Sequence, residues 1–271
     1  MKRIVLAMFL LLMLSFSVYG DELYEPPRLF NIPTAPAIRS LDLNASGGVI
    51  FATGEFSFLG SGLIGLGDVA QFELSTFGAL SRFGEGETDL LRTPAAGVKV
   101  YLPFDKVSKF LPAISGAFRR SFGEKEEGEA YQRQLADLYL MASKRFFRGT
   151  RWRGFSLHAG ADYLGARLTD LHSNEAFTKN FLMPFAGIEV WIAPKVKLMG
   201  EFEWTPSFKE DDPKEKIDSV WMTIGGVRYF LTSFITIDIG VKYREDFDSI
   251  ADANIESRIA LSIPTHLIYK E

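Results

Sequence analysis

Apolar and polar residues alternate with a period of two along most of the chain. In residues 235–243 the apolar side chains alternate with Thr236, Asp238, Gly240 and Lys242. The same alternation occurs in residues 196–204, 156–162 and 258–263, and more loosely in residues 38–46, 48–59, 69–81, 95–104, 111–122, 134–145, 182–193 and 219–231. Because successive side chains of a strand point to opposite faces, this pattern predicts about twelve strands, each with one apolar and one polar face. Residues 48–59 and 219–231 keep the alternation poorly, so about ten strands are the alternative count.

The connections between the expected strands alternate between long and short. Long polar connections are expected at residues 83–92, 123–133, 169–180, 208–218 and 246–254, and short ones at 105–110, 146–153, 194–195 and 232–233. Long loops at one end and short turns at the other are typical of outer-membrane barrels. The fold class predicted is therefore all-β, an antiparallel transmembrane β-barrel with both termini on the periplasmic side.

Aromatic residues gather near the ends of the expected strands, as the two aromatic girdles of a lipid-facing barrel would require. Those beside the short turns are Phe104, Phe110, Phe146, Phe147, Trp152, Trp191, Phe230 and Phe234. Those beside the long loops are Phe83, Phe122, Tyr163, Phe181, Trp204, Trp221, Tyr243 and Phe247. The alternative is a secreted or periplasmic soluble β-barrel or sandwich that binds an apolar ligand, because its strands would alternate in the same way.

The N-terminus carries the one long apolar run of the chain. Lys2 and Arg3 precede eleven apolar residues at 4–14, and small or permissive residues follow up to Gly20. This arrangement is typical of a secretory signal peptide and is short of the roughly 20 residues of a membrane-spanning helix. The expected divisions are a signal peptide at 1–20, cleaved near Gly20, an irregular leader at 21–36, the barrel at 37–264 and a short tail at 265–271.

Composition removes several classes of function. The chain has no Cys, which excludes disulfide scaffolds, thiol catalysis and Cys-based metal sites. Its 30 Lys and Arg against 34 Asp and Glu give no basic footprint for nucleic acid. No cofactor and no metal is expected. The expected partners are outer-membrane lipids and small polar solutes that pass through the barrel. The sequence does not predict the oligomeric state.

The polar set of the alternating strands is expected to line the interior of the barrel. Its predicted members are Glu73, Lys99, Arg119, Asp137, His158, Asp162, Glu189, Glu201, Glu203, Arg228, Asp238, Lys242 and Arg258. These groups either pair across neighbouring strands and fill the lumen or line a water-filled pore. Pairing is favoured, because no segment of the chain resembles a plug or a constriction loop.

Two groups of residues invite a catalytic interpretation. Glu201 and Glu203 share one face of a strand and can act as an acid–base pair, although a salt-bridged wall is favoured. His158 shares a face with Ser156 and Asp162, but side chains two residues apart on a strand are roughly 7 Å apart. No catalytic residue is predicted, and an outer-membrane lipid hydrolase centred on His158 is the third alternative.

Two short stretches resemble uncharacterised bacterial outer-membrane β-barrel proteins. They are NIPTAP at residues 31–36 and GVKVYLPF at residues 97–104. The resemblance implies a barrel and an envelope location, and no functional residue is carried over from it. The function expected is a non-enzymatic envelope component, either structural or a narrow passive pore for small solutes.

Overall fold

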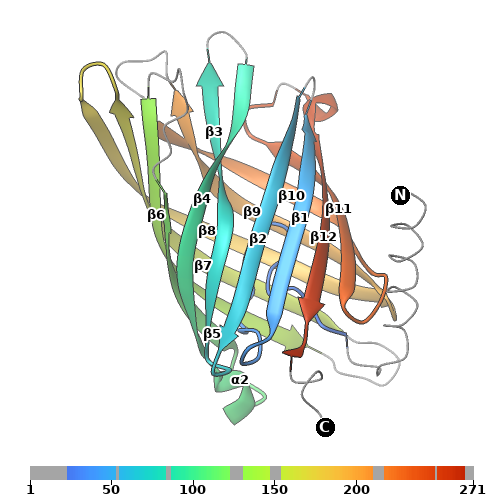
Figure 1. Ribbon diagram of the computed structural model, residues 1–271. Helices are drawn as coiled ribbons and strands as arrows, with labels where there is room; N and C mark the ends of the chain where they lie inside the picture. The colour runs from blue at the N-terminus through green and yellow to red at the C-terminus, as the bar shows by residue number, and fades with distance from the viewer. Residues whose placement is uncertain are drawn as a thin grey trace, which may run out of the picture.

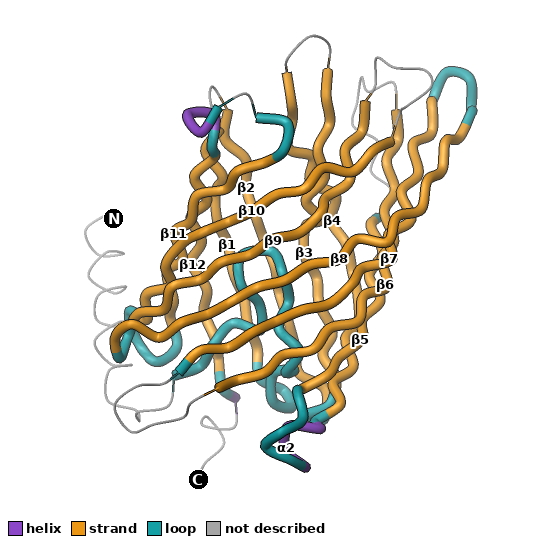
Figure 2. The backbone as a smooth tube through the Cα atoms, turned by 180° about the vertical axis from the view of Figure 1, so that it is seen from behind, coloured by secondary structure: helices purple, strands orange, loops and turns teal. Residues whose placement is uncertain are grey.

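The computed structural model describes residues 23–52, 55–83, 87–122, 131–146, 154–209, 217–247 and 249–265. The predicted signal peptide, its cleavage near Gly20, nearly all of the C-terminal tail, Phe147 and Trp152 lie outside the described residues. Within the described residues the chain forms a closed barrel of twelve antiparallel strands, in which each strand pairs with its sequence neighbours and the first pairs with the last (Figures 1 and 2). The predicted fold class is confirmed, with twelve strands and not ten.

The strands are long enough to cross a membrane at a tilt, which requires about 9–11 residues. Their bounds are β1 Leu43–Ala52, β2 Glu55–Leu66, β3 Ala70–Phe83, β4 Glu87–Leu102, β5 Ala113–Ser121, β6 Tyr131–Phe146, β7 Phe155–Asp170, β8 Ala176–Ala193, β9 Val196–Lys209, β10 Ile217–Phe230, β11 Ile235–Arg244 and β12 Asn254–Ile263. Two short helical turns, α2 at Phe104–Val107 and η2 at Ile250–Asp252, lie in connections. No helix among these residues is long and apolar enough to span a bilayer.

The expected difference in connection length between the two ends is not present: the strand bounds leave between 2 residues (194–195) and 10 residues (103–112) at one end, and between 2 (53–54) and 9 (122–130) at the other. At the end where β1 begins and β12 ends, which we call the short-turn end, β8 and β9 are joined by residues 194–195 only. The β2–β3 turn at the same end has left-handed backbone at Gly67 (φ 65°) and Asp68 (φ 60°), a conformation that suits Gly and Asp in tight hairpins. We call the opposite end the distal end; the connections β5–β6 and β9–β10 are there (Figure 1).

Three expected boundaries are wrong. Residues 43–52 form one uninterrupted strand, so the expected break at residue 47 does not exist. Residues 83–92 are not a loop, because β3 and β4 continue as a paired hairpin to Phe83↔Glu87. The loop expected at 169–180 shrinks to a turn between Asp170 and Ala176. In the last two cases a ladder of backbone hydrogen bonds extends past the apolar band without needing apolar side chains. In the first case Gly47 pairs with Gly60 on one side and with Ile259 on the other, so the ladder continues through it.

The outer face of the barrel is apolar. Leu140, Leu182 and Ile259 are 64%, 73% and 57% exposed, whereas their strand neighbours on the opposite face are buried. Ile239 likewise points outward between the buried Asp238 and Gly240. A soluble barrel would place these apolar rows in its interior. The observed orientation is that of a barrel surrounded by lipid.

Aromatic rings form a continuous row on the outside near the distal end. Phe202 contacts Trp204 and Trp221, with ring centroids 4.8 and 6.0 Å apart, and Trp221 continues to Tyr243 at 6.1 Å. This row is the expected girdle on β9, β10 and β11. At the short-turn end the expectation is wrong for Trp191 and Phe230, which stack at 5.2 Å but are buried inside the barrel.

Near the distal end β9 stops pairing with β8 and pairs with β3 instead. The β8–β9 ladder ends at Ala186↔Phe202, and beyond it the last residues of β9 run parallel to β3, from Leu80↔Ser207 to Arg82↔Lys209. Pro184 lies just past the end of the β8–β9 ladder, near the middle of β8 and not at the rim as its missing donor suggests. A buried apolar cluster that includes Leu164, Met183 and Phe208 fills the interior at this level.

Candidate functional site

Residues 23–42, which we call the plug, lie inside the barrel. The plug begins at the short-turn end, where the Tyr24 N–H donates to the Ser233 carbonyl at 2.9 Å, and it reverses direction through the bridge Arg28↔Pro33. Leu29, Phe30 and Ile32 are between 0% and 1% exposed. The tube of Figure 2 shows this irregular segment enclosed by the strands. The expectation that no segment resembles a plug is therefore wrong: a proline-rich stretch has no periodicity of its own and reveals its place only when the barrel surrounds it.

Glu201 on β9 binds the turn of the plug. Its carboxylate accepts the backbone N–H groups of Phe30, Asn31 and Ile32, the last two at 3.0 and 2.9 Å. Its neighbour Glu203 accepts the Asn31 side-chain amide at 2.7 Å. Successive N–H groups that converge on one anion form a strong, charge-assisted site. Glu201 is thus an anchor for main-chain donors and not one half of an acid–base pair.

Cationic side chains of the wall bind the carbonyl groups of the plug. Lys99 donates to the carbonyl oxygens of Thr34 and Pro36 at 2.9 and 3.0 Å. Arg228 donates to the Arg28 carbonyl at 2.9 Å and more weakly to that of Leu29 at 3.3 Å. Because Lys99 and Arg228 are fully buried, these carbonyl groups are what satisfies part of their hydrogen-bonding capacity.

The remaining charges of the wall pair with one another, mostly across strands; Arg258 and Glu256 are neighbours on β12, and Lys197 also reaches the plug. Arg228 and Asp238 are directly opposite and form two hydrogen bonds of 2.8 Å. Opposite charges on adjacent strands are a favourable cross-strand pair. The other pairs are Arg119 with Asp137 and, at 3.6 Å, with Glu73; Lys242 with Glu256 at 3.0 Å; Arg258 with Glu256 at 2.7 Å; and Lys197 with Glu189 at 3.0 Å and with Glu25 of the plug.

All thirteen residues expected to line the interior occupy inward-facing strand positions. Ten of them are below 9% exposed, and Arg119, Asp162 and Glu203 are partly buried. Twelve of the thirteen contact another wall group or the plug, whereas the Oδ1 atom of Asp162 is buried without a hydrogen-bond partner among the described residues. The plug's own Glu25, Arg28 and Asn31, together with Ser143 on β6, complete the site; no pattern singles them out, because their roles depend on strand register and on where the plug lies.

Glycines form sockets for two plug side chains. A Cβ atom at Gly240 would lie 2.7 Å from the Phe30 ring, and one at Gly226 would lie 2.6 Å from it. A Cβ atom at Gly187 would lie 2.3 Å from Leu29. Around these sockets Leu29, Phe30, Ile32 and Ala35 share one buried cluster with wall residues Tyr101, Ala113, Ala117, Tyr139, Met141, Phe185, Met199 and Ile224. The lumen is therefore filled at this level.

His158 contacts Ser143 and not the expected Ser156. The Ser143 hydroxyl lies 2.7 Å from His158 Nδ1, and His158 Nε2 lies 3.7 Å from Glu189. Ser156 is two residues away on the same strand, and Asp162 lies further along it opposite Met183, so the expected group does not form. The Ser143 hydroxyl also accepts the N–H of Ala35 at 2.9 Å, so the plug covers it. The order of the three groups is that of a hydrolytic triad, without the free hydroxyl that attack on a substrate needs.

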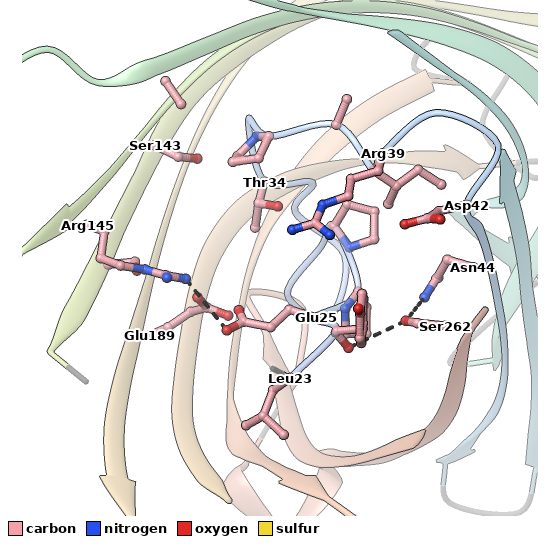
Figure 3. Close-up of a pocket in the computed structure, with 18 of the residues that line it drawn as sticks. Leu23, Glu25, Thr34, Arg39, Asp42, Asn44, Ser143, Arg145, Glu189 and Ser262 are labelled. Atoms are coloured by element: carbon pink, nitrogen blue, oxygen red, sulfur yellow. Dashed lines mark hydrogen bonds and ion pairs between the residues drawn. The ribbon is translucent and has the colours of Figure 1, made fainter. Parts of the chain in front are cut away.

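A polar cavity of about 950 Å³ lies at the short-turn end between the plug and the wall (Figure 3). Both signs of charge line it, and some groups are already paired: Arg145 lies 3.6 Å from Glu25, and Asn44 donates to Ser262 at 2.9 Å. Across the part of the chain that the structure describes, no group of three or more His, Asp and Glu side chains is placed to hold a metal ion. The arrangement suits hydrated polar solutes.

The fold is similar to those of solved outer-membrane barrels. The NanC porin matches with a TM-score of 0.50 and 12% identity over 82% of this chain and 98% of that one. An outer-membrane channel from Pseudomonas putida F1 matches with a TM-score of 0.51 and 10% identity over 84% and 98%. No protein-family model matches the sequence, and no curated protein matches it. The chain thus has the fold of the bacterial outer-membrane β-barrel proteins.

Proposed function

We propose that this chain is a non-enzymatic outer-membrane channel for small polar solutes. In the conformation described here the plug closes it at the short-turn end, and the β3–β9 pairing with its apolar cluster closes it near the distal end. The observation that carries the proposal is a barrel with an apolar outside, a charged inside and a separate irregular segment in the lumen. In the proposed route the signal peptide is removed near Gly20, and the mature chain enters the outer membrane with both termini in the periplasm.

The way in which the plug is held supports a channel that opens. No strand of the barrel pairs with residues 23–42 in a β-ladder; the only bridge within the plug is its own Arg28↔Pro33. The plug is held by side-chain to main-chain hydrogen bonds, by the two apolar sockets and by the ion pair of Glu25 with Lys197. Among the described residues, backbone hydrogen bonds to the wall occur only near its two ends, from Tyr24 to Ser233 and between Leu41, Asp42 and Gly65. These contacts can be broken without disturbing the strand pairs that close the wall.

The solute class follows from the lining. Buried carboxylates and cations alternate around the wall, and a route that opens when the plug leaves would be lined by both signs of charge. Such a lining favours polar and zwitterionic solutes over apolar ones. The two solved barrels of similar fold are a porin and an outer-membrane channel, which supports the same class of function.

The alternatives differ in specific observations. A purely structural barrel would have the same closed lumen and would stay closed when the plug is removed. A soluble protein that binds an apolar ligand does not account for the exposed apolar rows on the outer face. A lipid hydrolase centred on His158 does not account for a hydroxyl that is covered by the plug inside the lumen.

The test is the conductance of a chain that lacks residues 23–38, which keeps Arg39–Asp42 and all twelve strands. In planar bilayers we expect discrete current steps from the deletion variant and rare or no steps from the full chain. Both proteins should migrate faster on gels before heating than after, which shows that the barrel is folded. A folded deletion variant that gives no current steps, even when Phe208→Ala also removes a large side chain from the distal apolar cluster, would rule out the channel and leave the structural role.

A further inference from the structure

Most wall groups that hold the plug bind its main chain. Glu203 with the Asn31 amide, and Lys197 and Arg145 with Glu25, are the side-chain contacts among the groups described above. The carboxylate of Glu201 takes three backbone N–H groups, and Lys99 takes two backbone carbonyl groups. Arg228 takes two more carbonyl groups, and Gln71 accepts the Ile38 N–H at 3.3 Å. Any peptide in the same backbone conformation offers these donors and acceptors, because they belong to the chain and not to its sequence.

Sequence enters through the sockets. Phe30 occupies the space left by Gly226 and Gly240, and Leu29 occupies the space beside Gly187. Both side chains are 0% exposed. The site therefore selects a bulky aliphatic residue followed by an aromatic one, at the turn of an otherwise extended peptide.

A vacated lumen would leave charged groups without partners. Glu201 is 3% exposed and Lys99 is 0% exposed. Among the described residues neither Glu201 nor Lys99 forms an ion pair with another wall residue, in contrast to Arg228 with Asp238. These exposures hold with the plug in place. When the plug leaves, water solvates both groups, and a peptide that brings the same converging main-chain donors and acceptors restores the charge-assisted hydrogen bonds.

We propose that the lumen is a peptide-binding site, which the plug occupies in this conformation and which an unstructured peptide with an aliphatic–aromatic pair occupies when the plug leaves. The inference deepens the proposed function, since it rests on a plug that can be displaced, and it names peptides as a class of ligand. Main-chain recognition gives the affinity, and the glycine sockets give the selectivity.

The test measures binding directly and does not depend on conductance. A fluorescent peptide with the sequence of residues 23–38 is titrated, by anisotropy, into three folded proteins: the full chain, full-length Phe30→Ala, and the chain that lacks residues 23–38. We expect no binding to the full chain, weak binding to Phe30→Ala and the tightest binding to the deletion variant. A scrambled peptide of the same composition should bind at least about tenfold more weakly. Equal binding of the two peptides would overturn the proposal.

A matched pair of glycine variants tests the socket itself. Gly240→Ala, made in the deletion background, narrows the space for the Phe30 ring, whereas Gly225→Ala adds a methyl group where nothing lies within 4 Å. We expect Gly240→Ala to weaken the native peptide by about tenfold or more and to leave a Phe30→Ala peptide unaffected. Gly225→Ala should change neither. Equal loss for both peptides in Gly240→Ala would overturn the assignment of the socket.

The outcomes separate this inference from the proposed function. A deletion variant that conducts ions but does not bind the native peptide retains the channel and refutes the peptide site. One that binds the peptide selectively but gives no current retains the peptide site and refutes the channel. If the deletion variant does not fold, the comparison of full-length Phe30→Ala with the full chain decides the question alone.

Discussion

Charged side chains inside the barrel have two kinds of partner, and the kind decides what each residue does. Arg228 and Asp238 face each other on β10 and β11 and belong mainly to the wall, whereas Glu201 and Lys99 face the plug. The same residue types at the same alternating positions therefore serve stability in one place and closure in another. A substitution should reveal which of the two has been changed.

Replacing Glu201 with Gln tests closure. The amide keeps the size of the side chain but loses the charge and one of the two acceptor oxygens that hold three N–H groups. Hydrogen bonds to a charged group contribute about 1.5–3 kcal/mol, so the open fraction should rise by roughly ten- to a hundredfold. Single-channel recording measures it as the frequency of openings.

Glu203→Gln is the control for that change, because Glu203 bonds only the side chain of Asn31 among the plug groups of the described structure. We expect its openings to stay within a few-fold of the unmodified chain. If the Glu201→Gln channel opened as rarely as the unmodified chain, the carboxylate would not be what holds the plug.

Replacing Arg228 with Met tests the stability of the wall. The substitution leaves Asp238 buried without its two hydrogen bonds, and breaking a buried pair in this way costs about 3–5 kcal/mol. Urea unfolding from lipid vesicles measures the loss. Arg120→Met, on the exposed face of β5, is the matched control with a small expected effect. Adding Asp238→Asn to Arg228→Met should recover part of the loss, and no recovery would argue against the buried charge as its cause.

Elements with a regular period were predictable, and elements without one were not. The alternation in residues 235–243 and 196–204 predicted β11 and β9 closely, since an apolar outside and a polar inside leave a direct record in the sequence. The inward direction of the thirteen polar residues follows from the same rule. The hairpin of β3 and β4 beyond the apolar band was missed, because backbone pairing there leaves no such record.

The candidate site was harder to predict than the fold, for a physical reason. Ser143 lies opposite His158 only because β6 and β7 pair in one register, and a single sequence does not specify register. Residues 129–145 also have the composition of an amphipathic helix, yet Tyr131–Phe146 is a strand, because the neighbouring strands supply its hydrogen bonds. The plug combines both difficulties, since the side chains of the wall that bind it are far from it in the sequence.

Release of the plug as a unit can be followed by proteolysis. Arg28 lies within the buried turn of the plug, so trypsin should cleave after it only when the plug has left the lumen. We expect the full chain to resist cleavage at this site and full-length Gly240→Ala to be cut at least about tenfold faster, because its new methyl group meets the Phe30 ring. Mass spectrometry of the products identifies the site.

Two further variants check the cause of that cleavage. Gly225→Ala, on the outer face, should leave Arg28 protected. Adding Phe30→Ala to Gly240→Ala removes the clash, so the double variant should be cut no faster than Phe30→Ala alone. Faster cleavage of the double variant than of Phe30→Ala would mean that Gly240→Ala had loosened the barrel and not the plug.

At the scale of the whole molecule, the chain places many large apolar side chains on the outside and many charged ones inside, which is the reverse of a soluble protein. Apolar residues make up 47% of the chain, which is ordinary for a soluble domain, but many of the largest are on the outside. Lys99, Lys197 and Arg228 are among the most buried side chains of the described structure. The plug and the apolar clusters complete an interior that is part charged and part apolar, and lipid takes the place of water around the outside.

This arrangement predicts that one substitution on the outer face has a small effect on stability if the face contacts water and a large effect if it contacts lipid. Leu140 is 64% exposed near the middle of β6, so Leu140→Arg on a soluble protein would change the free energy of unfolding by within about 0.5 kcal/mol. In a bilayer an arginine on the lipid face near the midplane costs about 2–4 kcal/mol. Reversible unfolding from lipid vesicles measures the difference. Val107→Arg in α2, 80% exposed beyond the strands at the short-turn end, is the control with a near-zero expected change. If Leu140→Arg were as mild as Val107→Arg, lipid would not surround this face, and the outer-membrane assignment would fail with it.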